Sequence, residues 1–93
     1  RAELRAAAFW YEEHRKQLGV RFHAAVKAVE LAISRSPRSY PEIDSVNDVA
    51  IRRARVAEFP YGVVFLETGD AIWILAVMHL HRRPGYWRER AER

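Results

Sequence analysis

The sequence predicts an α+β fold in which an N-terminal helical hairpin packs on an antiparallel sheet of three or more strands. Apolar residues in the first third of the chain recur at helical spacing. Further on, two short runs rich in β-branched and aromatic residues, 63–66 and 72–78, flank the turn residues 68–70. This arrangement is typical of a β-hairpin. The stretch 51–58 alternates well enough to be a third strand, so the three strands predict a meander.

Two amphipathic helices are expected, one from about residue 2 to 17 and one ending near residue 34. Gly19 is interpreted as the C-terminal stop of the first helix. The apolar stripes consist of Leu4, Ala7, Ala8, Tyr11 and Leu18, and of Phe22, Val26, Val29 and Ile33. The simplest interpretation places these stripes and Trp10 in the core. Apolar surface left exposed on the outer side of the two helices would instead mark a groove for the partner protein that the family resemblance given below implies.

Alternation assigns a side of the sheet to each strand residue. In the 51–58 strand, Ala54 and Val56 are expected to face the core, which leaves Arg53, Arg55 and Phe59 on the open face. In the last strand one face is expected to hold Trp73, Leu75, Val77, His79 and His81, and the other Ile72, Ile74, Ala76, Met78 and Leu80. Because both faces are apolar, we expect this strand to be central and covered on both sides. Residues 38–49 contain proline, serine and aspartate and are expected to form a loop.

Composition is that of a single small domain over residues 1–93, with 49% hydrophobic residues. The chain has no cysteine, which excludes disulfides, thiolate chemistry and cysteine-based zinc sites. No apolar run has the roughly 20 residues of a membrane span, and no signal peptide opens the sequence. A cytoplasmic protein with no membrane partner is therefore expected. The net charge of +4 favours an anionic partner, either nucleic acid or an acidic protein.

The order of elements and several short motifs resemble the RelE/ParE superfamily of toxins from type II toxin–antitoxin systems, also called plasmid-stabilisation proteins. The resemblance covers nearly the whole chain. It is carried by Arg52 with Phe59-Pro60-Tyr61, Ala76-Val77 with His79, Arg82-Arg83-Pro84 with Tyr86-Trp87, Trp10-Tyr11-Glu12, and Gly19 with Phe22. One departure is that the family usually has a strand before its first helix, and that N-terminal strand is not found here.

The resemblance implies a toxin that is neutralised by a cognate antitoxin, in a higher-order complex and without a cofactor. ParE-type members inhibit DNA gyrase, whereas RelE-type members are mRNA interferases that cut messenger RNA on the ribosome. The ribonuclease pattern places two of its basic positions at Arg53 and Arg55. Two others, usually arginine, fall at about Gly62 and Leu80, which have no charge to stabilise a phosphorane. This difference favours a ParE-like gyrase inhibitor. The alternatives are a ribosome-dependent endoribonuclease or an inactive relative that only binds an antitoxin, so enzymatic activity stays open.

Two sets of candidate site residues follow. If the protein is a ribonuclease, the catalytic candidates are Arg53, Arg55, His79, His81 and Tyr86. The target-binding candidates are Arg82, Arg83, Tyr86, Trp87, Arg88 and Arg90.

Each set also has other interpretations. His79 and His81 are two residues apart on one strand, so they are either an acid–base pair or a packed residue followed by a rim residue. They lack a third ligand at fixed spacing, so no metal site is expected. The arginines of both sets, together with Arg52, have three possible roles. They bind phosphates and bases, they form a solvated polar face with Trp87 folded back onto the sheet, or they are covered by the antitoxin.

Overall fold

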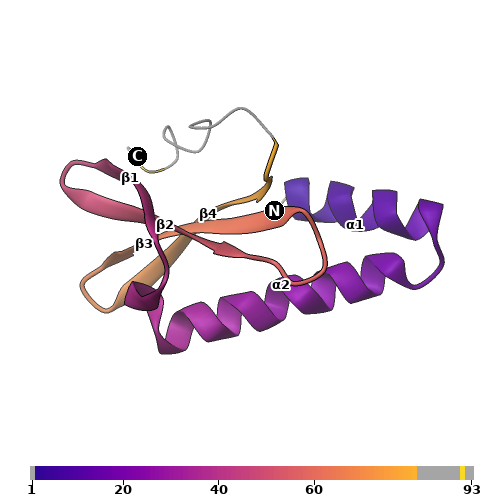
Figure 1. Cartoon of the computed structure of the whole chain (residues 1–93), viewed down its shortest axis with the longest axis horizontal. Coiled ribbons are helices and arrows are strands. Elements are labelled where there is room, and N and C mark those ends of the chain that lie inside the picture. Colours follow the sequence, from indigo (N-terminus) through magenta and orange to yellow (C-terminus); the bar gives the residue numbers. More distant parts are fainter. Residues whose placement is uncertain (1, 82–90, 92–93) are drawn as a thin grey trace.

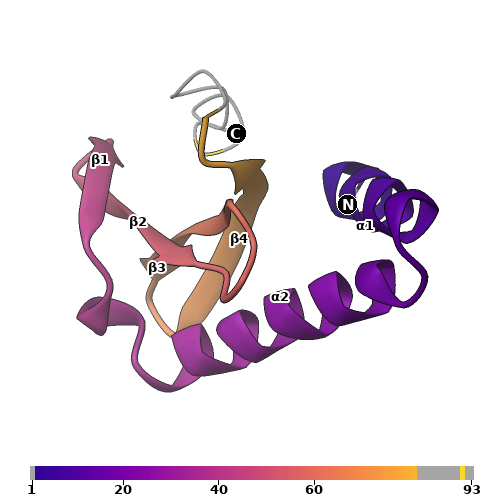
Figure 2. The ribbon, with the colours of Figure 1, turned by 45° about the vertical axis from the view of Figure 1, so that its right-hand side comes forward.

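The computed structural model describes residues 2–81 and 91, and it has the predicted α+β architecture. Two helices precede a four-stranded antiparallel meander of order β1-β2-β3-β4. The helices are α1 (Ala2–His14) and α2 (Leu18–Arg35), followed by the short 3₁₀ helix η1 (Pro37–Ser39). The strands are β1 (Glu42–Val46), β2 (Val49–Arg55), β3 (Tyr61–Thr68) and β4 (Ala71–His79). Figure 1 shows α2 running along the sheet and α1 beside it, and the turned view of Figure 2 places α1 at the β4 end.

The side chain of Glu12 stabilises the turn between the helices, and no glycine terminates α1. α1 ends at His14, three residues earlier than predicted, and Gln17 takes the left-handed conformation with φ 73°. The Glu12 carboxylate accepts hydrogen bonds from the backbone N–H groups of Gln17 (3.0 Å) and Gly19 (3.1 Å). It thereby satisfies donors that the start of a helix leaves unpaired. Gly19 belongs to α2, so its interpretation as the stop of the first helix is wrong.

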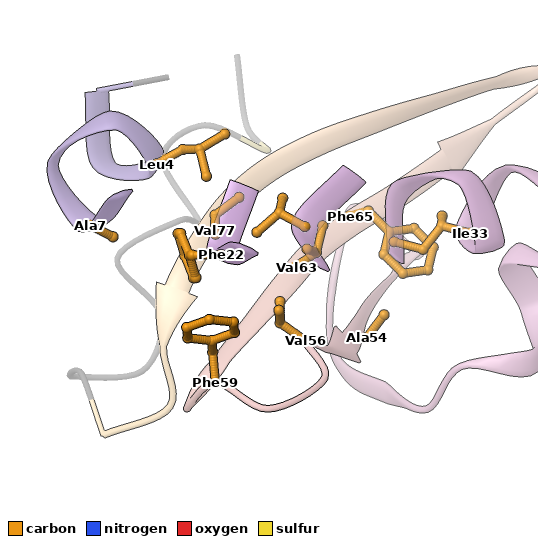
Figure 3. Close-up of a cluster of buried hydrophobic side chains, with 11 residues drawn as sticks. Leu4, Ala7, Phe22, Ile33, Ala54, Val56, Phe59, Val63, Phe65 and Val77 are labelled. Atoms are coloured by element: carbon orange, nitrogen blue, oxygen red, sulfur yellow. The ribbon is translucent and has the colours of Figure 1, made fainter. Parts of the chain in front are cut away.

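The main core lies between the helices and the sheet, and we call it the helix-side core (Figure 3). Phe22, Val26 and Ile33 from α2 are at most 1% exposed, as the predicted stripe requires. Burial of side chains of this size contributes roughly 1.5–3 kcal/mol each. The helix-side core consists of Leu4, Ala7, Phe22, Val26, Ile33, Ala54, Val56, Phe59, Val63, Phe65 and Val77. Ala54 and Val56 thus face the helices as predicted.

The opposite face of the sheet carries a second buried cluster, which we call the open-side cluster. Its members are Val46, Ile51, Val64, Leu66, Leu75, Ala76 and Met78. Ala91, the described residue of the C-terminal segment, packs against this cluster. The expectation of apolar residues on both faces of β4 is therefore confirmed. Among the described strands, however, β4 is at the edge of the sheet and not central.

A β-bulge in β4 changes which residues share a face. Val64 pairs with Ala76 and Phe65 pairs with Ile74, so Leu75 is left without an opposite residue. One extra residue shifts the alternation by one position. Before the bulge, Ile72 and Ile74 therefore pack with Val77 on the helix side, while Leu75 joins Ala76 and Met78 on the other side. The predicted division of the strand into odd and even residues is wrong for this reason.

The segment 38–49, predicted as a loop, contains β1 and most of η1. Asn47 and Asp48 have φ values of 50° and 65° and join Val46 to Val49, which are paired residues of a tight hairpin. Two consecutive positive φ values define the turn type that Asn-containing pairs favour. Beyond β2, Glu58 has φ 70° and the chain reverses, which buries Phe59 in the helix-side core. Phe59 is therefore not on the open face with Arg53.

Candidate functional site

The four positions that correspond to the ribonuclease pattern meet at one end of the open face. A Cβ on Gly62 would lie 2.9 Å from both Cγ and Cδ of Arg53, and 3.3 Å from Cδ2 of Leu80. The aliphatic stem of Arg53 and the side chain of Leu80 thus pack over the bare backbone of Gly62. Arg55 is the cross-strand partner of Gly62 and is exposed. Two guanidinium groups and two uncharged residues therefore form this end of the sheet.

Arg53 and Arg55 are available to an anion. Within the part of the chain that the structure describes, neither side chain makes an ion pair. Guanidinium groups of this kind bind phosphate or carboxylate groups through charge-assisted hydrogen bonds. The site is therefore cationic, but it has fewer cations than the four-position pattern.

Arg52 does not belong to this basic surface. It lies on the helix side of β2, where Nη1 donates to the backbone carbonyl of Tyr40 at 2.7 Å. Its Nη2 also contacts the Glu42 carboxylate at 3.4 Å. These contacts tie the segment before β1 to β2, so the role of Arg52 in the described structure is structural.

His79 and His81 lie close together at the end of β4. Their ring centroids are 5.3 Å apart, and the backbone N–H of His81 donates to Nδ1 of His79 at 3.1 Å. His79 is partly buried and also contacts the ring of Tyr61, with centroids 5.1 Å apart. His81 is exposed. The pair thus has a packed, hydrogen-bonded member and a rim member, and the Nδ1 of His79 is already occupied as an acceptor.

The sheet separates His79 from the two arginines. His79 lines a small cavity of about 280 Å³ on the helix side together with Glu3, Trp10, Tyr61 and Val77, next to α1. Arg53 and Arg55 lie on the other face. A general base that activates a 2′-hydroxyl must be within hydrogen-bonding reach of the atom it deprotonates, close to the cations that hold the phosphate. The described arginines and His79 do not form such a constellation on one face.

Tyr61 was not among the sequence candidates, although it sits between the aromatic core and His79. Burial raises the pKa of the Tyr61 phenol above its usual value of 10.0. Burial also raises the pKa of Tyr11, and the neighbouring Tyr61 raises it further. Both phenols are therefore neutral at physiological pH. Tyr61 can donate a hydrogen bond in the cavity, but it is a poor base.

A groove between α1 and α2 has apolar surface of the kind that the sequence analysis gave as the alternative to a fully buried hairpin. Trp10 was expected in the core, but it is 53% exposed, so that expectation is wrong. Phe9 and Val20 line the groove and are 67% and 63% exposed. The available signal was the spacing of Val20, Ala24 and Leu31, which places apolar residues on the face of α2 opposite its buried stripe.

The remaining target-binding candidates, Arg82, Arg83, Tyr86, Trp87, Arg88 and Arg90, lie outside the described residues, and so does the catalytic candidate Tyr86. Their roles stay predictions. Among residues 2–81 and 91, no group of three or more histidine, cysteine, aspartate or glutamate side chains is arranged to hold a metal ion. In the same residues, no helix combines the length and apolar character needed to cross a membrane.

Comparison of the chain with protein families, with curated proteins and with solved structures finds no significant match. The described fold and site therefore define the protein as an α+β chain with a helical hairpin on a four-stranded meander. It has a cationic patch of Arg53 and Arg55 on the open face.

Proposed function

We propose that the chain is the toxin of a type II toxin–antitoxin system, that it acts in the cytoplasm on DNA gyrase in the ParE-like manner, and that a cognate antitoxin neutralises it. The proposal rests first on the resemblance of the sequence motifs. The order of the described elements, two helices followed by a meander, agrees with that resemblance.

One observation favours gyrase inhibition over RNA cleavage. Gly62 and Leu80 pack against the stem of Arg53 at positions where the ribonuclease pattern has cations. Neither residue can neutralise the charge of a transferring phosphoryl group. His79 lies on the other face and cannot complete the set. An inhibitor that binds its target through a basic surface does not need these groups.

The test is DNA supercoiling by purified gyrase with increasing amounts of the full chain. We expect supercoiling to be inhibited and cleaved DNA to accumulate. The double variant Arg88→Glu, Arg90→Glu reverses charge in the predicted target-binding segment and is expected to lose inhibition while keeping its circular dichroism spectrum. The double variant Arg15→Glu, Lys16→Glu changes the net charge by the same amount in the exposed turn between the helices and serves as the matched control. Gyrase that is unaffected by the unaltered chain would refute the proposal.

The ribosome-dependent endoribonuclease is the second candidate because Arg53 and Arg55 are side by side on an accessible face with no described ion pair. Under this alternative, the chain cleaves messenger RNA in a purified translation system. The double variant Arg53→Ala, Arg55→Ala is expected to abolish cleavage and leave antitoxin binding intact. Cleavage at an unchanged rate in that variant would exclude this mechanism. A chain that affects neither gyrase nor messenger RNA, yet binds its antitoxin, would be an inactive relative.

A further inference from the structure

A small cavity lies between α1 and the edge strand β4, on the helix side of the sheet (Figure 2). It has a volume of about 280 Å³, and Ala7 and Val77 give it apolar walls. Trp10 also lines it and is 53% exposed, so a solute has access to the cavity. Sites for small molecules combine apolar and aromatic walls with a few convergent polar groups, and this cavity has the same make-up.

The charged group of the cavity is a carboxylate. Among the described residues that line it, Glu3 is the one acid, and no lysine or arginine occurs. This is notable in a chain with a net charge of +4. Oε1 of Glu3 accepts the backbone N–H of Val77 at 3.2 Å, which holds the carboxylate at the cavity. A carboxylate has about four acceptor positions, so it can accept further hydrogen bonds from a ligand.

Two aromatic rings from different elements stand beside this carboxylate. Trp10 comes from α1 and stacks on His14 with centroids 3.9 Å apart. Tyr61 comes from β3 and packs edge-on against Phe22 with centroids 4.9 Å apart. Both rings are therefore held in place by their neighbours. The faces of tryptophan and tyrosine attract a cation within about 6 Å of the ring centroid, so the rings and the carboxylate favour the same charge.

The other two polar groups do not cancel the charge of Glu3. Nδ1 of His79 accepts the backbone N–H of His81, so this nitrogen carries no proton and the ring is neutral, with its proton on Nε2. Burial raises the pKa of the Tyr61 phenol, which is therefore also neutral at physiological pH. The phenol oxygen keeps acceptor capacity for an N–H group.

An anion or a neutral solute fits this set of groups less well. The Nε2–H of His79 and the O–H of Tyr61 can donate to an anion, but the carboxylate of Glu3 repels it and no described cation of the lining compensates. A neutral solute gains nothing from the carboxylate charge. The volume is at the lower end of the range for ligand sites, so the occupant must be small.

We propose that the cavity between α1 and β4 binds the primary ammonium group of a small alkylamine. The ammonium donates to the carboxylate of Glu3 and the phenol oxygen of Tyr61 beside the ring of Trp10, and the alkyl chain packs on Ala7 and Val77. The inference rests on this cavity alone and does not depend on the proposed toxin function.

The test is a titration of the full chain with n-butylammonium chloride, followed by amide and indole chemical shifts in NMR spectra. We expect saturable shifts of Val77, His79 and the Trp10 indole N–H, with a dissociation constant of about 1 mM for so small a ligand. Sodium butyrate and n-butanol have the same chain length and should bind at least about tenfold more weakly, because they lack the positive charge. Shifts that do not saturate far above that concentration, or equal binding of the three probes, would overturn the proposal.

Glu3→Gln removes the charge and keeps an oxygen that accepts the Val77 N–H. We expect it to weaken binding of n-butylammonium about tenfold or more. The matched control is Glu13→Gln, which makes the same charge change at an exposed position of the same helix outside the cavity lining and should alter the affinity less than about twofold. Equal affinity of Glu3→Gln and the unaltered chain would show that the carboxylate is not the site.

Trp10→Ala is a second variant, at a largely exposed ring, and it decides the question if Glu3→Gln impairs folding as judged by circular dichroism. It removes an aromatic face and is expected to weaken binding severalfold. Unchanged affinity in this variant would contradict the proposed cavity. Gyrase inhibition is measured separately, so the outcome of one experiment does not decide the other.

Discussion

The substitution Gly19→Ala tests whether the close approach of α1 and α2 requires a residue without a side chain. A Cβ at this position would lie 2.4 Å from the backbone carbonyl oxygen of Ala8 and 3.0 Å from Cβ of Glu12. To reach even a tight contact of 3.0 Å, the atoms must separate by 3.0 − 2.4 = 0.6 Å. Because the first contact is with backbone, a rotamer change cannot provide this space.

Several energies oppose one another in this variant. Overpacking costs about 1–3 kcal/mol. Displacement of α1 also weakens the Glu12 hydrogen bond to the Gly19 N–H, a loss of about 0.5–1.5 kcal/mol. In the opposite direction, the higher helix propensity of alanine stabilises α2 by at most about 1 kcal/mol. We therefore expect a net loss of about 1–3 kcal/mol, with a fall in Tm of about 4–8 °C for each kcal/mol in a domain of this size.

The assay is thermal and urea unfolding followed by circular dichroism. Ala24→Gly, at an exposed position of the same helix, calibrates propensity and is expected to lose about 0.5–1 kcal/mol without any steric change. A Gly19→Ala variant with a raised Tm would mean that propensity outweighs packing, and it would refute the reasoning from close approach.

Three further predictions concern the helix-side core, Arg52 on the helix side of β2, and the partly buried phenol of Tyr61. Phe22→Ala should lose about 3–5 kcal/mol in urea unfolding, because this ring is 0% exposed, while Phe9→Ala stays within about 0.5 kcal/mol; equal losses would contradict the core assignment. Arg52→Ala should lose about 1 kcal/mol by removing the bond to the Tyr40 carbonyl, and no loss would show that this bond is not stabilising. The raised pKa of Tyr61 means that its phenol loses the proton more readily in the unfolded state, so the contribution of Tyr61 to stability is constant below about pH 10 and falls as the pH rises above it. Tyr61→Phe should reduce this alkaline loss in urea unfolding at several pH values, and an unchanged profile would assign the effect to another group.

Much of the fold follows from local patterns in the sequence. The apolar spacing of Phe22, Val26, Val29 and Ile33 predicts a helix whichever sheet it packs on. Three of these residues are buried, and Val29 is partly buried. Residues 63–66 and 72–78 around Gly69 predict β3 and β4 because β-branched residues favour strands and glycine accepts the φ of 58° found in the turn. The pair Asn47 and Asp48 is also typical of a hairpin turn, but the polar residues around it favour a loop, so β1 was not predicted.

The composition of the candidate site could not be predicted from the sequence, because a single bulge in β4 changes which residues share a face of the sheet. Simple alternation from Trp73 puts Val77 and His79 together with Leu75, whereas the bulge places Leu75 on the opposite face. Sequence alternation also does not say that Arg53 will lie over Gly62, because that contact joins two strands.

Local sequence patterns are sufficient to predict the helical hairpin, the meander and the apolar character of both faces of β4. These features depend on the periodicity of neighbouring residues, which is a local property. The close approach of Gly19 to Ala8, and the location of Arg53 and His79 on opposite faces of the sheet, are known only from the packed structure. The packing also left Phe9 and Val20 exposed on the outer side of the hairpin. These features depend on which distant segments pack together, and that choice is made by the balance of burial over the whole chain.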